Sequence, residues 1–393
     1  MPQPPGQTSA GQGTAHFRAF ARPVWLGSGG NAMLPGRNHW GEGRAMGASR
    51  LALLCGYYGE HNIGDDALLA ALLQQLPPGW TPLVTGYDQA ELEQRFGVPT
   101  CPRRSLKAVL AALGRCQALI LGGGSLLQDA TSWRSLLYYL LLIAAARLAG
   151  KPVLLWGQGL GPLRRRPSRL LVRLVLPLVA ASSWRDPASA AQLRRWGVSC
   201  LEGSDPVWSL PPLAWQGSGG PIVLCFRSSP LLGPPQWRLV LEALAQLATS
   251  SDRQVLWLPF HRGQDTGLLG RLQDQGLVPE VLAARSRECP VTSPEQAMQV
   301  FAAAGLVLAM RLHGLILAAL TSAPCCALSY DPKVAAAARA IACPCLDLEG
   351  PFPAAAALAA SWQDQLDCPL APESINAQRQ AARVHAELLH QLT

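Results

Sequence analysis

Residues 51–69 read LALLCGYYGEHNIGDDALL and decide the fold, because an apolar strand, a glycine-rich loop and the first turn of a helix follow one another there. This order outlines a phosphate-binding turn. Asp65 or Asp66, however, begins the expected helix, and an aspartate in that position occupies the free N–H groups itself. We therefore expect the glycines to shape a tight turn rather than to hold an anion.

The same alternation of an apolar run and a helical stretch continues along the chain. The runs are RLALLCG (50–56), CQALILGGG (116–124), KPVLLWGQGLG (151–161), PIVLCFR (221–227), RQVLWLPFH (253–261), GLVLAMRLH (305–313) and APCCALSYD (323–331). Strands that are apolar throughout are buried on both faces, and helices between them make βαβ units. The pattern predicts an α/β protein with two Rossmann-like, doubly wound parallel-sheet domains facing a cleft.

The domain boundary is placed where this periodicity lapses. Proline and glycine cluster in LPPLAWQGSGG (210–220). The first domain is expected over residues 46–212 and the second over residues 213–370, and a final helix within residues 371–393 is expected to pack back on the first domain. Residues 1–45 lack periodicity and are rich in Gly and Pro, which predicts a disordered extension.

Composition narrows the class of ligand and the location. The net charge of +8 fits acidic small ligands, an anionic membrane surface or nucleic acid, but no basic run is interleaved with aromatic residues, which disfavours nucleic acid. The 11 cysteines show neither a C-x-x-C pair nor zinc-ligand spacing, so we interpret them as reduced thiols of a cytoplasmic protein without a metal site. No secretory signal is apparent. The most apolar run, residues 136–150, is short and contains Arg147, which predicts a buried helix rather than a membrane span.

Candidate functional residues follow from the rule that open parallel sheets bind ligands beyond the carboxyl ends of their strands. In the first domain the rule selects Tyr57, Tyr58, Glu60, His61, Asn62, Gly122 to Ser125 and Gln158. In the second domain it selects Arg227, His261, Arg311, His313, Tyr330, Asp331 and Lys333.

Arg311 and His313 are the most informative pair among these candidates. Residues two apart at a strand end share a face, where an arginine can bind a carboxylate or phosphate with two hydrogen bonds and a histidine can carry a proton near neutral pH. Lys333 and Arg185 also follow apolar runs, and His261 lies at the same rim. Structural alternatives stay open for each: caps on neighbouring carbonyls, a solvated lysine, an Arg–Asp surface pair and a buried, hydrogen-bonded histidine.

Eight motifs, taken together, resemble a known family. They are GYYGEHNIGDDALL, LILGGGSLLQD, WGQGLGPL, WRDPAS, SDPVW, LPFHRGQD, MRLHGLI and SYDPK, and they occur in the order found in bacterial polysaccharide pyruvyl transferases. The resemblance covers residues 51–333. It implies a fold similar to the two-domain glycosyltransferase B architecture, and transfer of pyruvyl from phosphoenolpyruvate onto a sugar of a cell-surface polysaccharide precursor as a cyclic ketal.

The resemblance also implies roles for individual residues. The family's arginine-x-histidine motif falls on Arg311 and His313, which are the catalytic candidates. Phosphoenolpyruvate is expected to contact Arg311, His313, Lys333, Arg185 and Arg227. The acceptor sugar is expected to contact Tyr58, Glu60, Asn62 and His261. Glu60 replaces an aromatic residue of many relatives, so we expect it to tune which sugar is accepted.

The implied reaction starts with protonation of the methylene carbon, for which His313 is the candidate general acid and base. Phosphoenolpyruvate is a co-substrate, and neither a cofactor nor a metal is expected. The acceptor in this family is often a lipid-linked oligosaccharide at the inner face of the membrane. Residues 164–179, RRRPSRLLVRLVLPLV, either contact that membrane peripherally or form an ordinary helix with a solvated arginine face. Two other functions stay open: a glycosyltransferase of the same fold that uses a nucleotide sugar, and a non-catalytic glycan-binding module.

Overall fold

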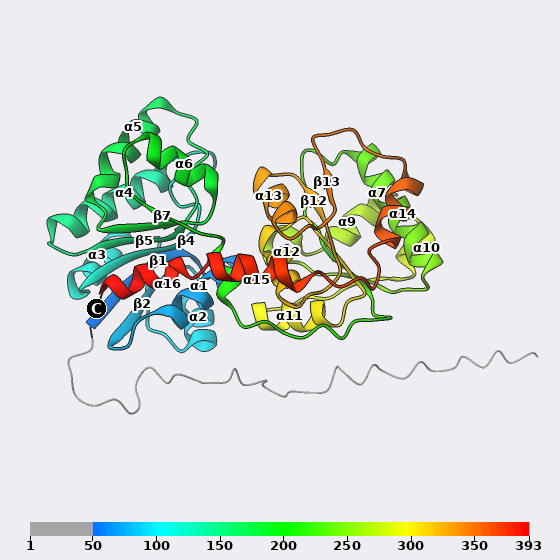
Figure 1. The fold of residues 1–393 in the computed structure, drawn as a ribbon, viewed down its shortest axis with the longest axis horizontal. Helices are drawn as coiled ribbons and strands as arrows, with labels where there is room; N and C mark the ends of the chain where they lie inside the picture. The colour runs from blue at the N-terminus through cyan, green and yellow to red at the C-terminus, as the bar shows by residue number, and fades with distance from the viewer. Residues whose placement is uncertain (1–49, 393) are drawn as a thin grey trace, which may run out of the picture. The chain divides into compact units, whose positions relative to one another are not determined.

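The computed structural model describes residues 50–392, which build two parallel sheets with helices packed on them (Figure 1). The first sheet has seven strands in the order β3-β2-β1-β4-β5-β6-β7, and the second has six in the order β10-β9-β8-β11-β12-β13. Every strand pairing is parallel. The predicted α/β fold with two parallel-sheet domains is confirmed. The extension predicted over residues 1–45 lies outside the described residues.

The first sheet and its helices occupy residues 50–209. Its strands are β1 (Arg50–Tyr58), β2 (Trp80–Gly86), β3 (Thr100–Pro102), β4 (Ala118–Gly124), β5 (Val153–Gln158), β6 (Ala181–Trp184) and β7 (Leu201–Glu202). The helices between them are α1 (Ile63–Gln75), α2 (Gln89–Phe96), α3 (Leu106–Arg115), α4 (Trp133–Leu148), α5 (Arg166–Val175) and α6 (Pro187–Arg195), with the 3-10 helices η1 (Leu176–Leu178) and η2 (Pro206–Ser209).

The second sheet begins after residues 210–221, a linker without helix or strand. Its strands are β8 (Ile222–Cys225), β9 (Val255–Trp257), β10 (Ser286–Glu288), β11 (Leu306–Ala309), β12 (Cys325–Ser329) and β13 (Cys345–Asp347). Its helices are α7 (Pro234–Ser250), α8 (Arg262–Asp265), α9 (Leu268–Asp274), α10 (Glu280–Ala283), α11 (Pro294–Ala302), α12 (Leu312–Leu320), α13 (Pro332–Ala340) and α14 (Ala355–Gln363).

The central strands are apolar because both faces of each sheet are covered. In the first sheet Leu53 of β1 lies opposite Leu119 of β4, and Leu121 of β4 lies opposite Leu155 of β5; all four side chains are fully buried. Helices α3 and α4 cover one face of this sheet, and α1 and α16 (Val384–Leu389) cover the other (Figure 1). Among the described residues, no helix has the length and apolar character needed to span a bilayer.

The chain returns to the first sheet at its carboxyl end. After α14 it forms α15 (Pro372–Ala381), then α16, then the 3-10 helix η3 (His390–Leu392). Helix α16 contacts β5 and β6, and Nη1 of Arg50 donates a hydrogen bond to the carbonyl of Leu392 at 3.1 Å. The last turns of the chain therefore complete the core that the first strand begins.

Short polar side chains begin the helices that follow the strand ends. Asn62, Asp186 and Asp331 each accept a hydrogen bond from a backbone N–H in the first turn of α1, α6 and α13, respectively. These caps fix where each strand-to-helix loop ends. They thereby set the positions of the side chains at the carboxyl edge of both sheets.

Candidate active site

A charged cluster joins side chains from both domains. Nε2 of His313, in the first turn of α12, lies 3.3 Å from Oδ2 of Asp205, which precedes η2. Nη1 of Arg185, which follows β6, donates to the same carboxylate oxygen at 2.5 Å and lies 3.5 Å from Nε2 of His313. The predicted residues Arg185 and His313 therefore lie together, and Asp205 connects them.

Asp205 is an ionised carboxylate in a buried position. Burial alone would raise its pKa, but the guanidinium of Arg185 and the imidazole of His313 hold the pKa well below its ordinary value. Oδ1 of Asp205 also accepts a hydrogen bond from the backbone N–H of Val207 at 3.0 Å. This carboxylate thus orients both the arginine and the histidine.

Lys333 reaches the same region from α13. Its Nζ donates to Oγ of Ser125, which follows β4, at 2.8 Å. A Cβ at Gly159, just after β5, would lie 2.8 Å from that Oγ and 3.4 Å from Nε of Arg185. Ser125 and Arg185 therefore both approach the main chain at Gly159, and Lys333 is hydrogen-bonded to this same Ser125. Burial lowers the pKa of Lys333, and the nearby charge of Arg185 lowers it further.

Helix α1 closes the other side of the histidine. A Cβ added at Gly64, in the first turn of α1, would collide with Nδ1 of His313, so the absence of a side chain there makes room for the ring. Asp65 follows, and burial raises the pKa of its carboxyl against the opposing effect of His313. The cluster can hold an anion through Arg185, Lys333 and His313, and it contains carboxyl groups that can keep these cations in place.

Arg311 does not join this cluster. Its Nη2 and Nε bind Oδ1 and Oδ2 of Asp265 at 2.5 and 3.1 Å, and the Asp265 side chain is fully buried. The inference that Arg311 and His313 share one face is wrong, because β11 ends at Ala309 and α12 begins at Leu312. Arg311 is the N-cap of α12 and His313 lies inside that helix, so the strand rule for residues two apart does not apply to this pair. Arg311 instead holds the loop that carries His261, whose backbone N–H donates to Oδ2 of Asp265 at 2.8 Å.

Arg227 and His261 lie at the rim of the second domain. Nη1 of Arg227 donates to the hydroxyl of Tyr330 at 3.1 Å, and its guanidinium lies 4.9 Å from the centre of that ring. His261 caps α8, with Nδ1 accepting from the N–H of Gly263 at 3.2 Å. Burial lowers the pKa of His261, and the charge of Arg311 lowers it further. Neither side chain forms a hydrogen bond with the cluster around Asp205 in the described residues.

Tyr58 is buried rather than presented to a ligand. Its exposed fraction is 1%, and a Cβ at Gly56 or at Gly122 would collide with its ring or its hydroxyl. The ring therefore folds back over β1 and β4, into space that two glycines leave open. This buried position does not support the expectation that Tyr58 contacts the acceptor sugar. Its hydroxyl has no hydrogen-bond partner among the described residues, and burial raises its pKa well above the usual value.

Glu60 and Asn62 are held by contacts within the protein. Glu60 forms ion pairs with Arg103 at 2.5 Å and Arg104 at 3.4 Å. Asn62 caps α1: its Oδ1 accepts from the N–H of Gly64 at 3.1 Å, and its Nδ2 donates to Asp65 at 2.6 Å. Glu60 remains partly exposed, so its carboxylate can still meet a ligand, but as one half of an ion pair.

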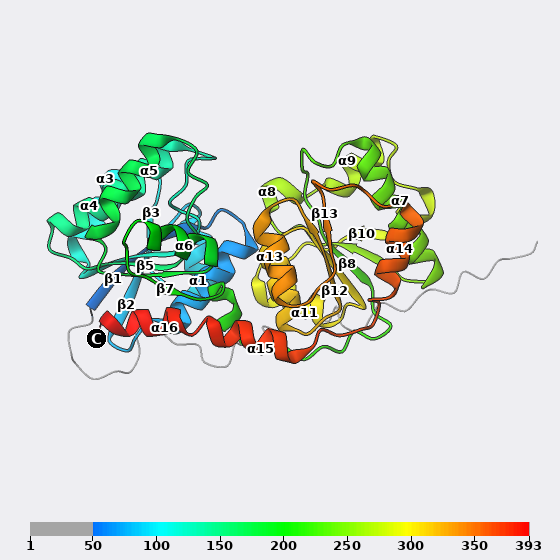
Figure 2. The same ribbon diagram turned by 45° about the horizontal axis from the view of Figure 1, so that its top comes forward.

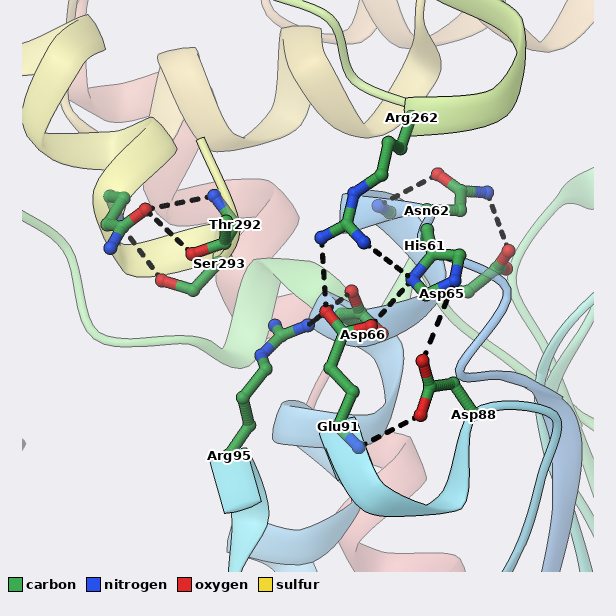
Figure 3. A network of polar contacts seen from close by, with 12 residues as sticks. His61, Asn62, Asp65, Asp66, Asp88, Glu91, Arg95, Arg262, Thr292 and Ser293 are labelled. Carbon is green, nitrogen blue, oxygen red and sulfur yellow. Dashed lines mark hydrogen bonds and ion pairs between the residues drawn. The ribbon is translucent and has the colours of Figure 1, made fainter. Parts of the chain in front are cut away.

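The loop after β1 is hydrogen-bonded to the second domain. The N–H of Ile63 donates to the carbonyl of Phe260 at 3.0 Å, and the N–H of Arg262 donates to the carbonyl of His61 at 3.0 Å. Figure 3 shows the ionic contacts beside this seam. Nδ1 of His61 lies 2.6 Å from Oε2 of Glu91, and Nη2 of Arg262 lies 3.6 Å from Oε1 of the same carboxylate.

His61, Glu91 and Asp88 also bring potential metal-ligand atoms within 4.8 Å of one another. Arg262 and Arg95 both contact the Glu91 carboxylate, at 3.6 and 3.4 Å. Because two guanidinium groups already compensate its charge, we interpret this group as an ion-pair network between the domains.

Sequence reasoning missed Asp205 as a site residue and did not assign a role to Ser125 or Asp65. Asp205 lies inside SDPVW, so the order of motifs indicated the segment without indicating the side chain. The strand-end rule did select Ser125, because it directly follows β4, but it did not indicate the bond to Lys333. Asp65 was interpreted only as a residue that begins a helix, and its proximity to His313 depends on the packing of two domains.

Solved structures with the same fold come from several enzymes. The chain is similar to a UDP-N-acetylglucosamine 2-epimerase from Methanocaldococcus jannaschii, with a TM-score of 0.58 and 12% identity over 87% of this chain and 99% of that one. It is also similar to a putative UDP-N-acetylglucosamine 2-epimerase from Listeria monocytogenes, with a TM-score of 0.55 and 13% identity over 88% of this chain and 95% of that one. A third similar structure is HepE from Anabaena in complex with UDP-glucose, with a TM-score of 0.50 and 12% identity over 87% of this chain and 98% of that one. At such identities the likeness concerns the fold alone, which is glycosyltransferase B-like.

Family membership rests on the sequence. No curated protein is similar enough to match the chain. The family model for polysaccharide pyruvyl transferase matches residues 62–332, which is more than half of the chain and contains Arg185, Asp205 and His313. The chain therefore belongs to the polysaccharide pyruvyl transferase family.

Proposed function

We propose that this protein transfers pyruvyl from phosphoenolpyruvate onto a sugar of a polysaccharide precursor as a cyclic ketal and releases phosphate. The observation that carries the proposal is the meeting of Arg185, Lys333 and His313 in one partly buried cluster of a family member. Phosphoenolpyruvate has a phosphate and a carboxylate, so its site needs fixed cations from more than one direction. Arg185 comes from the first domain and the other two residues from the second.

In the proposed reaction His313 protonates C3, the methylene carbon, and positive charge develops at C2. One sugar hydroxyl bonds to C2 and loses its proton, and the bond from C2 to the phosphate oxygen breaks. The second hydroxyl then bonds to C2, loses its proton and closes the ketal. One released proton restores His313, and the other leaves with phosphate. The sequence of steps consumes no further co-reactant.

Three neighbours would support His313 in this role. Asp205 lies at Nε2 of His313 and orients the ring, and Gly64 leaves room for the ring at Nδ1. Arg185 supplies positive charge beside Nε2. Lys333 and Arg185 would bind the phosphate and carboxylate of the substrate. Arg311 would act at a distance, by fixing the loop around His261 through Asp265.

We propose a lipid-linked sugar as the acceptor and the cytoplasm as the location. Glu60 and His261 lie on loops of opposite domains that meet at the hydrogen-bonded seam, so an acceptor there would contact both. Glu60→Gln should change the KM for the acceptor without changing the KM for phosphoenolpyruvate. Equal changes in both KM values would contradict a contact between Glu60 and the acceptor.

The central test incubates the purified protein with phosphoenolpyruvate and candidate lipid-linked sugars. A product heavier than the acceptor by pyruvate less one water, formed together with inorganic phosphate, is the expected result. His313→Ala should abolish transfer while circular dichroism stays unchanged. Lys333→Met should raise the KM for phosphoenolpyruvate by about ten- to a hundredfold, because a charged hydrogen bond is lost. Full turnover by His313→Ala would contradict the proposed mechanism.

A nucleotide-sugar-dependent glycosyltransferase is the second candidate. It is favoured by the likeness of the fold to HepE, whose structure contains UDP-glucose, and to two UDP-N-acetylglucosamine 2-epimerases. UDP-sugars would then raise the melting temperature and would be consumed with release of UDP. Phosphoenolpyruvate would have no effect on either measurement. A non-catalytic glycan-binding module would consume neither donor.

A further inference from the structure

Helix α5 and the 3-10 helix η1 that follows it expose leucine side chains to solvent in a regular pattern. Leu170, Leu174 and Leu178 are 59%, 62% and 37% exposed and follow one another at intervals of four residues. The opposite side of the helix packs on the domain through Ser168 and Val172, both fully buried. An apolar stripe on the outer side of a helix that is already anchored is unusual for a surface that only meets water.

Arginine side chains border the same stripe. Arg164, Arg165, Arg166, Arg169 and Arg173 are all exposed. Residues 130–185 contain nine lysines and arginines and no aspartate or glutamate. No ion pair among residues 50–392 involves any of these five arginines. The nearby carboxylate of Asp129 interacts with Arg165. The segment therefore presents exposed and mostly uncompensated positive charge next to exposed leucines.

The neighbouring helix also exposes leucines, and a groove lies beside α5. Helix α4 lies beside α5 in Figures 1 and 2 and exposes Leu141 and Leu148, which are 48% and 90% accessible. Between α5 and α6 lies a groove of about 630 Å³, which is lined in part by Arg169, Leu170 and Ser189. Oγ of Ser189 donates to Oδ2 of Asp186 at 2.7 Å, and Asp186 directly follows Arg185 of the charged cluster. Ser189 in the lining of the groove is thus one hydrogen bond away from the residue that follows Arg185.

We infer that α5, with the arginines that precede it, docks the protein on an anionic lipid bilayer. Leucines at this spacing would enter the acyl boundary, and the arginines would meet lipid phosphates. A second copy of the chain is a poorer occupant, because apposing two such faces would bring ten exposed arginines together. Only the reason for docking rests on the proposed function: docking would hold the protein close to a lipid-linked acceptor.

Vesicle sedimentation tests the inference without phosphoenolpyruvate or acceptor, so its outcome is independent of the catalytic proposal. The protein should sediment with vesicles of phosphatidylglycerol and phosphatidylcholine, less so at high salt, and only weakly with phosphatidylcholine alone. Arg169→Gln with Arg173→Gln should lower the partition coefficient by about thirtyfold, from about 1 kcal/mol for each charge. Leu170→Gln with Leu174→Gln should lower it by about tenfold or more.

Matched controls change the same residue types elsewhere on the surface. Leu213→Gln in the linker and Arg238→Gln on α7 are also exposed and should leave vesicle binding unchanged. All variants should keep the wild-type melting temperature. The inference is overturned if the wild type stays in solution with anionic vesicles at low salt, or if the double leucine variant binds as well as the wild type. It is also overturned if that variant instead dissociates a dimer, as sedimentation velocity would reveal.

Discussion

His385, the buried histidine of α16, should make a large contribution to the way the free energy of unfolding changes with pH. Its side chain is fully inaccessible, with Nδ1 2.8 Å from Oγ of Ser183 and Nε2 2.7 Å from the carbonyl oxygen of Ser204. A carbonyl can only accept, so Nε2 carries the proton and Nδ1 accepts from the hydroxyl. Burial lowers the pKa of His385 from 6.5 to about 4. Ser204 precedes Asp205, so this histidine supports the segment that carries the site carboxylate.

The sign of the effect follows from which state binds the proton. On acidification the unfolded chain protonates His385 near pH 6.5 and the folded chain only near pH 4. The stability contributed by the neutral ring is therefore present above the unfolded pKa and is lost as the pH falls from about 6.5 to about 4. The full shift corresponds to about 3 kcal/mol, of which about 2 kcal/mol should be lost between about pH 7.5 and about pH 5.

Chemical denaturation of the wild type and of His385→Gln at the two pH values measures this loss. A glutamine amide can still donate to the carbonyl of Ser204 but does not titrate. The stability of the wild type relative to the variant should fall by about 2 kcal/mol on acidification. Asp66, whose pKa burial raises to about 6, changes stability in the opposite sense in both proteins and cancels in the difference. His390→Gln, at an exposed position, controls for the loss of a histidine. A relative stability that changes by less than about 0.5 kcal/mol would refute the reasoning.

Two further substitutions test the charged cluster. Asp205→Asn should destabilise the fold by about 3–5 kcal/mol, measured by denaturation, because it leaves the buried guanidinium of Arg185 without its counter-charge; a loss below about 1 kcal/mol would mean that solvent or another group compensates the arginine. Gly64→Ala should lower kcat at least tenfold, because the new methyl group collides with the ring of His313. The same collision should lower the free energy of unfolding by about 1–3 kcal/mol. Gly114→Ala is its control, since a Cβ on that helical glycine meets no atom within 4 Å, and unchanged kcat in both variants would disprove the contact.

The positions of the strand ends could be predicted from the sequence. Runs such as ALILGGG in β4 are apolar throughout, so their type and direction follow from burial on both faces. In a parallel sheet all carboxyl ends lie at one edge, which brings Arg185, Ser125 and Gly159 together without knowledge of any distance. Lys333 and His313 were placed by the same rule in the second domain.

The partners of individual side chains could not be predicted in this way. Whether Arg311 faces a ligand depends on where β11 ends, and a shift of one or two residues turns it towards Asp265. Tyr58 is the last residue of β1, at the strand end that the rule selects, yet the missing side chains of Gly56 and Gly122 give its ring a buried place. Both outcomes are decided by tertiary packing, which single-residue preferences and motif order do not contain.

The return of the chain to its first sheet has a consequence for protein synthesis. Strands β5 and β6 leave the ribosome before the second domain, but the helix that covers them, with His385 between Ser183 and Ser204, is made only after that domain. The second domain lies wholly between these two events, so it can fold as a unit while the first still exposes part of its apolar core. A pause in translation before residue 384 would leave a nascent chain with a finished second half and an unfinished first half. Such an intermediate is a natural client for a chaperone that binds exposed strands.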